Sequence, residues 1–435
     1  MWWLGWFPGF LSSDSIDQLG QAYRFEFANF HPAFHTISIW AVTRLWEHPG
    51  AVTLAQVAAM SVVLALVARR LTGLGVPWWL AGGSMILVAA IPMVAVTTIT
   101  MWKDVPYTIA LTWAFAELLG MARDRRGFWT SPWGPLRLGA ALGLLMLYRH
   151  NGWITVGLVA VALAVAERRR LRRLLPLVGA IVVVGVVADA VVLRAFPVDP
   201  ASIEPAEVFV SDLAAVYRYR PDAFGPEDLE RLRAVAPLAV WTSRYDCHDS
   251  TPLAFDPAFD TTAIRQDPAT YRSLVARIVI GNLPVVLGHR WCAASYFFVP
   301  PQPTDAFFHR PPFDIPPNTL GVERRPISDR AYAMTKALYV WIEPAERLWL
   351  TWRPALVVWA GILTYGALAL RRRLRPLLWP GSLIAAQLLN AAATTPAQEF
   401  RFAFGVYLLC LASLPLWWLI LRPDDAAIAP VSDGS

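Results

Sequence analysis

The chain has 435 residues, of which 56% are hydrophobic and only 16% are charged. Soluble domains average about a quarter charged residues, so this composition excludes an ordinary soluble protein and indicates several membrane-spanning helices. The formal net charge of +6 averages over acidic and basic regions, and every basic residue except Lys103 and Lys336 is an arginine. We therefore do not read the charge as a sign of nucleic-acid binding.

The first polar stretch of the chain follows a short apolar segment and carries two carboxylates, Asp14 and Asp17. His31 and His35 come next. Polar groups beside a membrane are costly to keep unless they serve a function, so we predict Asp14 and Asp17 as catalytic residues. Two histidines spaced by four residues could hold a metal, but Pro32 puts His31 at a helix cap, so we predict that both histidines contact substrate.

The apolar segments that follow predict a bundle of membrane helices. A helix needs about 20 apolar residues to cross a bilayer. Segment 33–47 is expected to lie along the outer membrane surface. The stretch 136–166 is interrupted by a polar turn at 149–152, which predicts two shorter helices, 136–148 and 153–166. The segments of spanning length are 51–68, 76–98, 104–121, 173–195, 354–370, 377–395 and 403–421.

Arginine runs predict the direction of these helices. Runs at 69–70, 123–126, 168–173 and 371–375 each follow an alternate span. Because loops rich in Arg and Lys stay in the cytoplasm, these runs predict nine spans in the plasma membrane and a site on the extracytoplasmic side. The loops expected outside are 1–50, 99–103, 149–152, 196–353 and 396–402.

Two polar clusters fall at predicted outer ends of helices in the first half of the chain. Lys103 and Asp104 precede a span, where Lys103 could bind a phosphate and Asp104 could bind substrate or act only as the helix N-cap. Arg149, His150 and Asn151 occupy the turn between two short membrane helices, a position that packing does not explain. We predict that all five residues bind substrate.

A further cluster, Glu399 and Arg401, lies in the last outer loop. It is either part of the substrate site or a solvent-exposed ion pair of little energetic value. His289 and Arg290 are weaker substrate-binding candidates because they follow an amphipathic stretch.

The long segment 196–353 differs in character from the membrane helices. Residues 199–270 are acidic and could face the acceptor. Helices are expected at 206–218, 226–240 and 268–282. Residues 300–317 are rich in proline and are expected to be extended. We expect Cys247 and Cys292 either to form a disulfide or to be two buried thiols. These features divide the chain into an N-terminal membrane module with the catalytic loops (1–195), an extracytoplasmic insertion (196–353), C-terminal membrane helices (354–421) and a disordered tail (422–435).

Several motifs of the chain resemble those of a bacterial membrane family of unknown function. They are Ser13-Asp14-Ser15, His31-Pro32, Trp102-Lys103-Asp104-Val105-Pro106 and Arg149-His150-Asn151-Gly152. That family resembles the GT-C superfamily of glycosyltransferases, which use polyprenyl-phosphate sugars and invert the anomeric centre. The resemblance implies a GT-C-like helix bundle with its catalytic acid in the first outer loop, where Asp14 matches best and Asp17 second. Residues 1–11 are too short for the span that opens such chains, so the start lies upstream or this span is vestigial.

Together these observations predict an all-α polytopic membrane enzyme that transfers a sugar from a polyprenyl-phosphate donor to a glycan, lipid or protein acceptor of the envelope. Asp14 is expected to be the general base, and Lys103, Arg149 and Arg401 to contact the donor phosphate. No cofactor is expected, and a divalent metal is compatible but not required. The alternatives are a polysaccharide polymerase or ligase with a lipid-diphosphate donor, a flippase or transporter of lipid-linked sugars, and a non-catalytic scaffold.

Overall fold

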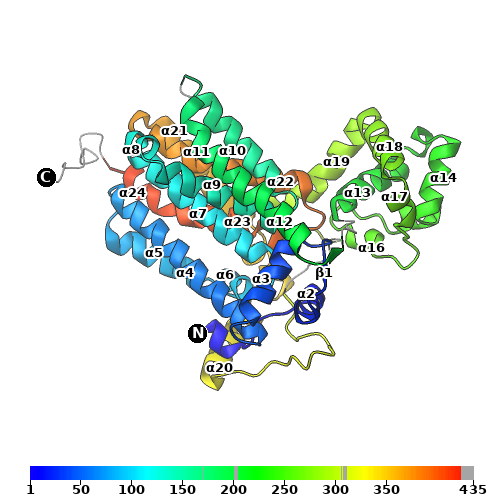
Figure 1. Ribbon diagram of the computed structural model, residues 1–435, viewed down its shortest axis with the longest axis horizontal. Helices are drawn as coiled ribbons and strands as arrows, with labels where there is room; N and C mark the ends of the chain where they lie inside the picture. Colours follow the sequence, from blue (N-terminus) through cyan, green and yellow to red (C-terminus); the bar gives the residue numbers. More distant parts are fainter. Residues whose placement is uncertain (170, 200–203, 305, 307–310, 423–435) are drawn as a thin grey trace.

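The computed structural model describes residues 1–169, 171–199, 204–304, 306 and 311–422, and nearly every element in these ranges is a helix (Figure 1). The two strands found there, β1 (Phe27–Ala28) and β2 (Val198–Asp199), pair in parallel. The predicted all-α class is confirmed. The predicted disordered tail falls outside the described residues except for its first position.

Apolar helices form a bundle around α7 (Asp104–Arg123) and α23 (Phe400–Ser413). Most residues of these two helices are buried, whereas the outer segment 171–195 buries few. Helix α7 packs against neighbours from both halves of the chain, so the N-terminal and C-terminal membrane helices share one core. The other bundle helices are α4 (Pro49–Gly73), α5 (Trp78–Ala90), α6 (Pro92–Thr98), α9 (Trp133–Tyr148), α10 (Gly152–Ala166), α11 (Leu175–Ile181), α12 (Ala188–Ala195), α21 (Ala355–Leu370) and α22 (Leu378–Thr394).

Fewer helices reach spanning length than the sequence predicts. Within the described residues, four helices are long and apolar enough to cross a membrane, or up to six if each of two bent pairs is one span. The predicted count of nine is therefore too high by this criterion. Pro92 begins α6 and breaks the segment 76–98, where α5 and α6 meet at 70°. The two short helices predicted around the turn at 149–152 are present as α9 and α10, and the chain is a multi-pass membrane protein.

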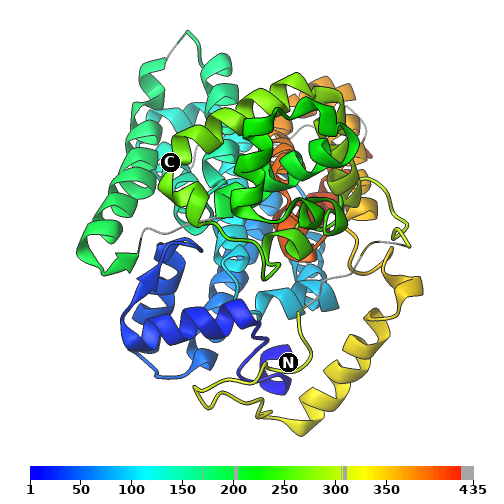
Figure 2. The ribbon, with the colours of Figure 1, turned by 90° about the vertical axis from the view of Figure 1, so that its right-hand side faces the viewer.

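The insertion forms a separate group of helices at one end of the bundle (Figures 1 and 2). It has its own core, which includes Leu213, Leu232 and Trp241. The α8 segment (Arg125–Thr130), which begins within the arginine run at 123–126, lies at the opposite end (Figure 1). The helices of the insertion are α13 (Glu204–Tyr219), α14 (Pro226–Val235), α15 (Leu238–Ser243), α16 (Thr251–Ala254), α17 (Thr262–Gln266), α18 (Pro268–Gly281) and α19 (Leu283–Ala294).

The helices predicted in the insertion are present, with two differences. The helix expected at 226–240 is broken at Pro237 into α14 and α15, and the one at 268–282 continues as α19 after a 94° bend. Helix α20 (Asp329–Ile342) leaves this group and packs instead on α1 (Trp2–Gly5), where Trp6 donates to Thr335 at 2.8 Å. Residues 1–11 thus form a four-residue helix and a buried aromatic segment, as their shortness predicts.

Candidate active site

The N-terminal segment is fastened to the loop before α7, and this brings the first two polar clusters together. Phe10 pairs with Thr100 in an isolated parallel bridge, and the Ser15 hydroxyl donates to the Met101 carbonyl at 2.9 Å. Ser15 also belongs to the capping box that begins α2 (Ser13–Arg24). Asp14, in the first turn of α2, is therefore held beside the loop that carries Lys103.

A cavity of about 590 Å³ lies where one end of the membrane helices meets the insertion. Eight of the residues predicted to form the site line it: Asp14, His31, Lys103, Arg149, His150, Asn151, Glu399 and Arg401. Its wall also contains aromatic side chains that the sequence analysis did not assign to the site: Phe30, Trp102, Trp153, Phe209, Phe255 and Phe402. Segments far apart in the sequence thus form one polar site with an apolar rim.

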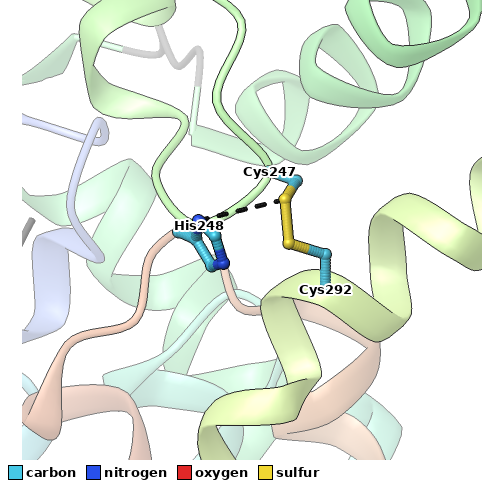
Figure 3. Close-up of side chains that lie close together, drawn as sticks. All are labelled: Cys247, His248 and Cys292. Carbon is cyan, nitrogen blue, oxygen red and sulfur yellow. Dashed lines mark hydrogen bonds between the residues drawn. A yellow bond between two sulfur atoms is a disulfide. The ribbon is translucent and has the colours of Figure 1, made fainter. Parts of the chain in front are cut away.

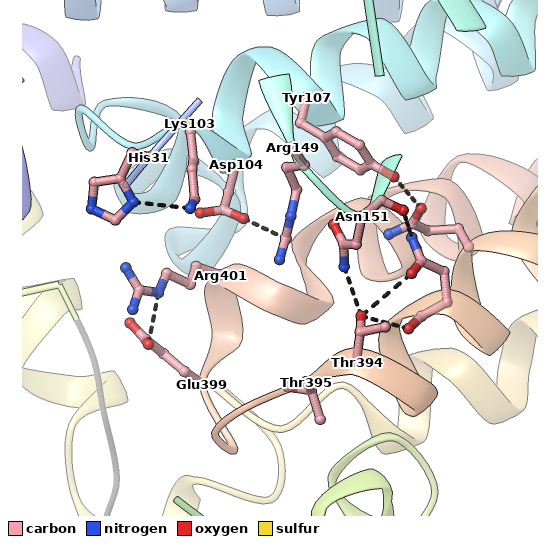
Figure 4. A network of polar contacts seen from close by, with 12 residues as sticks. His31, Lys103, Asp104, Tyr107, Arg149, Asn151, Thr394, Thr395, Glu399 and Arg401 are labelled. Carbon is pink, nitrogen blue, oxygen red and sulfur yellow. Dashed lines mark hydrogen bonds and ion pairs between the residues drawn. The ribbon is translucent and has the colours of Figure 1, made fainter. Parts of the chain in front are cut away.

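Arg401 joins the start of α23 to the first turn of α2. Its Nη1 lies 3.1 Å from Asp14 Oδ2. Its Nε lies 2.7 Å from Glu399 Oε2 (Figure 4). The guanidinium also lies over the ring of Phe402, 4.9 Å from its centroid. The Glu399 side chain is only 9% exposed, so the alternative of a solvent-exposed Glu399–Arg401 pair is wrong.

Lys103 and His31 complete the cationic surroundings of Asp14. Lys103 Nζ lies 3.0 Å from His31 Nδ1 (Figure 4). His31 Nε2 lies 3.7 Å from Asp14 Oδ2. Burial alone would raise the pKa of the Asp14 carboxyl, but Arg401, His31 and Lys103 outweigh it and hold that pKa below its ordinary value. The carboxylate is therefore ionised at neutral pH.

Arg149 reaches the cavity from the turn between α9 and α10. Its Nη1 donates to Asp104 Oδ1 at 2.5 Å, and its guanidinium lies over the rings of Tyr107 and Phe402. Asp104 is not the N-cap of α7, since that position belongs to Lys103, and its buried carboxylate orients Arg149 instead. The alternative that Asp104 only caps the helix is therefore wrong.

Polar side chains of the membrane helices support the turn that carries Arg149. Asn151 Nδ2 donates to Thr394 Oγ1 at 2.6 Å, and Asn390 Nδ2 donates to the Asn151 carbonyl at 3.1 Å (Figure 4). Gln387 accepts from Thr155 at 2.8 Å beneath them. The sequence analysis missed Gln387 and Asn390, although two amides inside an apolar helix are the kind of costly intramembrane polar group that signals a role.

Five predicted residues lie outside the cavity lining, and one of them is Asp104, whose contact with Arg149 is given above. Asp17 is exposed and accepts from Gln21 at 2.7 Å. His35 is buried, and its ring nitrogens have no hydrogen-bond partner among the described residues. His289 lies 3.1 Å from the hydroxyl of Tyr245, and Arg290 binds Asp212 at 2.6 Å. The last two therefore join α19 to neighbouring parts of the insertion.

The two cysteines of the insertion form a disulfide, which was one of the two alternatives that the sequence left open. Cys247 and Cys292 are bonded, with their Cα atoms 5.8 Å apart, and His248 lies beside them (Figure 3). These three residues are close enough to share a metal ion. With the two sulfurs bonded to each other, however, no thiolate is available as a ligand in this state.

Comparisons with known proteins give a family and two weak structural likenesses. The model of a family of unknown function, DUF6020, matches residues 38–255. ArnT from Cupriavidus metallidurans in the apo state is similar at 14% identity and a TM-score of 0.36, over 95% of this chain and 74% of that one. The same protein bound to undecaprenyl phosphate is similar at 15% identity and a TM-score of 0.37, over 95% and 75%. No curated protein matches the chain.

Proposed function

The chain belongs to DUF6020, a family of unknown function, and we propose that it is a membrane glycosyltransferase. It transfers a sugar from a polyprenyl-phosphate donor to an acceptor of the cell envelope, at the outer face of the plasma membrane and with inversion. The observation that carries this proposal is the meeting of one carboxylate, Asp14, with the cations of Lys103, Arg149 and Arg401 around a cavity beside membrane helices.

The three cations suit a donor phosphate. Arg149 and Arg401 are each oriented by a carboxylate, and Lys103 is oriented by His31, so their charges are in place before the ligand arrives. Preorganised cations stabilise the negative charge that grows on a departing phosphate without the cost of rearranging water. Charge-assisted hydrogen bonds to phosphate oxygens are also among the stronger contacts that a protein can make.

The apolar side of the cavity suits the lipid of such a donor. Trp153 lines the cavity from α10 and is 62% exposed. Ile154 follows it on the same helix and also lines the cavity. A polyprenyl chain can therefore leave the polar site along α10 and enter the membrane without crossing charged groups.

Asp14 is the general base of the proposed reaction. Its carboxylate accepts the proton of an acceptor hydroxyl, whose oxygen bonds to the anomeric carbon of the sugar while the bond from that carbon to the phosphate oxygen breaks. Polyprenyl phosphate is the leaving group. In the free protein Arg401 lowers the pKa of Asp14, and a phosphate that binds Arg401 opposes this effect, so donor binding makes Asp14 more basic.

Two features support an extracytoplasmic site. Disulfides persist in oxidising compartments, and Cys247 and Cys292 are bonded in the insertion that covers the cavity. The arginine-rich α8 segment lies at the other end of the bundle (Figure 1), as the positive-inside rule requires if the cavity faces outward.

Since the chain supplies its own cations to the phosphate, the proposal needs no metal, and transfer is expected to persist in EDTA.

The Asp14→Asn variant tests the proposal, with Asp17→Asn as its matched control. Asp17 lies on the same helix but is exposed and outside the cavity. Loss of a general base lowers a rate by about 10²- to 10⁴-fold. We expect this loss of sugar transfer for Asp14→Asn, with polyprenyl-phosphate binding retained, and nearly full transfer for Asp17→Asn. Full transfer by Asp14→Asn would remove Asp14 as the base, and a preference for diphosphate donors would favour a polymerase or ligase.

A further inference from the structure

The loop 395–399, which leads into the helix of Arg401, is joined to the insertion by backbone hydrogen bonds. Asp249 and Ala397 form an antiparallel bridge. Ser250 N donates to the Pro396 carbonyl at 2.8 Å, and Gln398 N donates to the His248 carbonyl at 2.9 Å. The loop therefore runs beside residues 248–250 of the insertion, directly before Glu399.

The side chain of Gln398 makes a second set of contacts, on the other side of the loop. It is 2% exposed, and its Nε2 donates to the Cys292 carbonyl at 3.0 Å and to Ser295 Oγ at 3.1 Å. Its Oε1 accepts from Arg353 Nη1 at 3.1 Å. A buried amide satisfied at both ends holds its backbone in one place, because a displacement breaks several hydrogen bonds of a side chain that is 2% exposed.

The disulfide connects these two sets of contacts. Cys247 precedes His248, whose carbonyl accepts from the Gln398 backbone, and Cys292 supplies the carbonyl that accepts from the Gln398 side chain. The two cysteines are 45 residues apart in the sequence, so their bond fixes the relative position of two segments that the chain alone leaves far apart. Both groups that hold Gln398 are thus tied to each other covalently.

We propose that Gln398 and the Cys247–Cys292 disulfide are positioning groups that hold Glu399 and Arg401 in place, so that phosphate binds the cavity more tightly when the disulfide is oxidised than when it is reduced. Glu399 follows Gln398 directly and is the N-cap of α23, and Arg401 is the second residue of that helix and lies 3.1 Å from Asp14. A shift of about 1 Å in such a loop is enough to remove a preorganised contact. The identity of the ligand in this inference rests on the proposed function, whereas the contacts that hold the loop 395–399 do not depend on it.

The experiment compares three variants of the full-length protein in detergent. Gln398→Leu removes the amide, and Cys247→Ser/Cys292→Ser removes the disulfide without leaving a lone thiol. Gln302→Leu is the matched control, because Gln302 accepts from the same Arg353 Nη1, at 2.7 Å, but makes no hydrogen bond to the loop 395–399 within the part of the chain that the structure describes. Hydrogen–deuterium exchange of the peptide 395–403 reports on the loop, and titration with a polyprenyl monophosphate reports on the site.

We expect Gln398→Leu and the double serine variant to exchange faster at 395–403 and to bind the lipid phosphate about tenfold more weakly. Gln302→Leu should bind it like the wild type even if its thermal unfolding midpoint falls. A thiol reductant should reproduce the double serine phenotype in the wild type and have no effect in the double serine variant. That pattern separates positioning from a general loss of stability.

The two readouts also separate the failure of this inference from the failure of the proposed function. Unchanged exchange at 395–403 in Gln398→Leu and in the reduced wild type would overturn the inference, whatever the ligand. Faster exchange with unchanged lipid-phosphate affinity would also overturn it, since the loop would then not position the site. If the wild type does not bind the lipid phosphate, the proposed function fails, and the exchange data still decide whether the loop is held in this way.

Discussion

Arg401 makes two ion pairs, and mutation can separate its contribution to stability from its contribution to phosphate binding. Arg401→Gln leaves Glu399 with its charge in a buried position, and removing one partner of a buried pair costs about 3–5 kcal/mol. The pair with Asp14 adds little, because that carboxylate is 38% exposed, whereas the Glu399 side chain is 9% exposed. We therefore expect Arg401→Gln to lower the free energy of unfolding by about 3 kcal/mol, mostly through Glu399.

The double variant Arg401→Gln/Glu399→Gln removes both charges at once. Replacing both members of a buried pair is often nearly neutral, so we expect its stability to return to within about 1 kcal/mol of the wild type. Binding of a polyprenyl monophosphate should not return, because the cation remains absent, and we expect a loss of about tenfold or more in both variants. Unfolding in detergent and equilibrium lipid binding measure the two effects.

Two outcomes would refute this reasoning. A double variant as unstable as Arg401→Gln would mean that the ion pair does not carry the stability assigned to it. A double variant that binds the lipid phosphate like the wild type would mean that Arg401 does not contact the phosphate, whatever its role in stability.

Three further predictions follow from the same cavity. Asp104→Asn should destabilise the protein by about 3 kcal/mol, because the buried carboxylate that orients Arg149 loses its charge. Added inorganic phosphate should stabilise this variant more than the wild type. Equal stability of the variant and the wild type would contradict this prediction. Because the pKa of Asp14 is lowered in the folded protein, its ionised carboxylate stabilises the fold at pH values above the ordinary pKa of 3.8, and this contribution is lost as the pH falls. The difference in thermal midpoint between the wild type and Asp14→Asn should therefore become smaller on acidification, and a larger difference would contradict this. Phe255→Ala should raise the KM for the acceptor about fivefold with an unchanged thermal midpoint, because the ring is exposed and lines the cavity from the insertion; an unchanged KM would exclude it from acceptor binding.

The sequence predicted the helices and the polar clusters because each has a local signature. An Arg-His-Asn turn between two apolar runs marks two short helices, and α9 and α10 begin and end close to the predicted bounds. The arginine runs predicted that Asp14, Lys103, Arg149 and Arg401 share one side of the membrane, and all four line one cavity. The break at Pro92 also has a local signal, which the assignment of a single span over 76–98 overlooked.

Contacts between distant segments could not be predicted in this way. Asp104 carries the local pattern of a helix cap, yet its partner is Arg149, which lies 45 residues away. Gln398 looks like an ordinary loop residue, and its role depends on Cys292 and Arg353, which come close only in the folded chain. Phe255 looks like an ordinary apolar residue of the insertion, and only the packing of the insertion on the bundle brings it to the cavity.

The central claim is that this cavity binds the phosphate of a lipid-linked sugar. A structure determined with a bound polyprenyl monophosphate tests it most directly. The account predicts phosphate density within hydrogen-bonding distance of Lys103, Arg149 and Arg401, with the lipid chain leaving along α10 past Trp153. Phosphate density at the opposite end of the bundle, among the arginines near Arg125 and Arg168, with an empty cavity would contradict it.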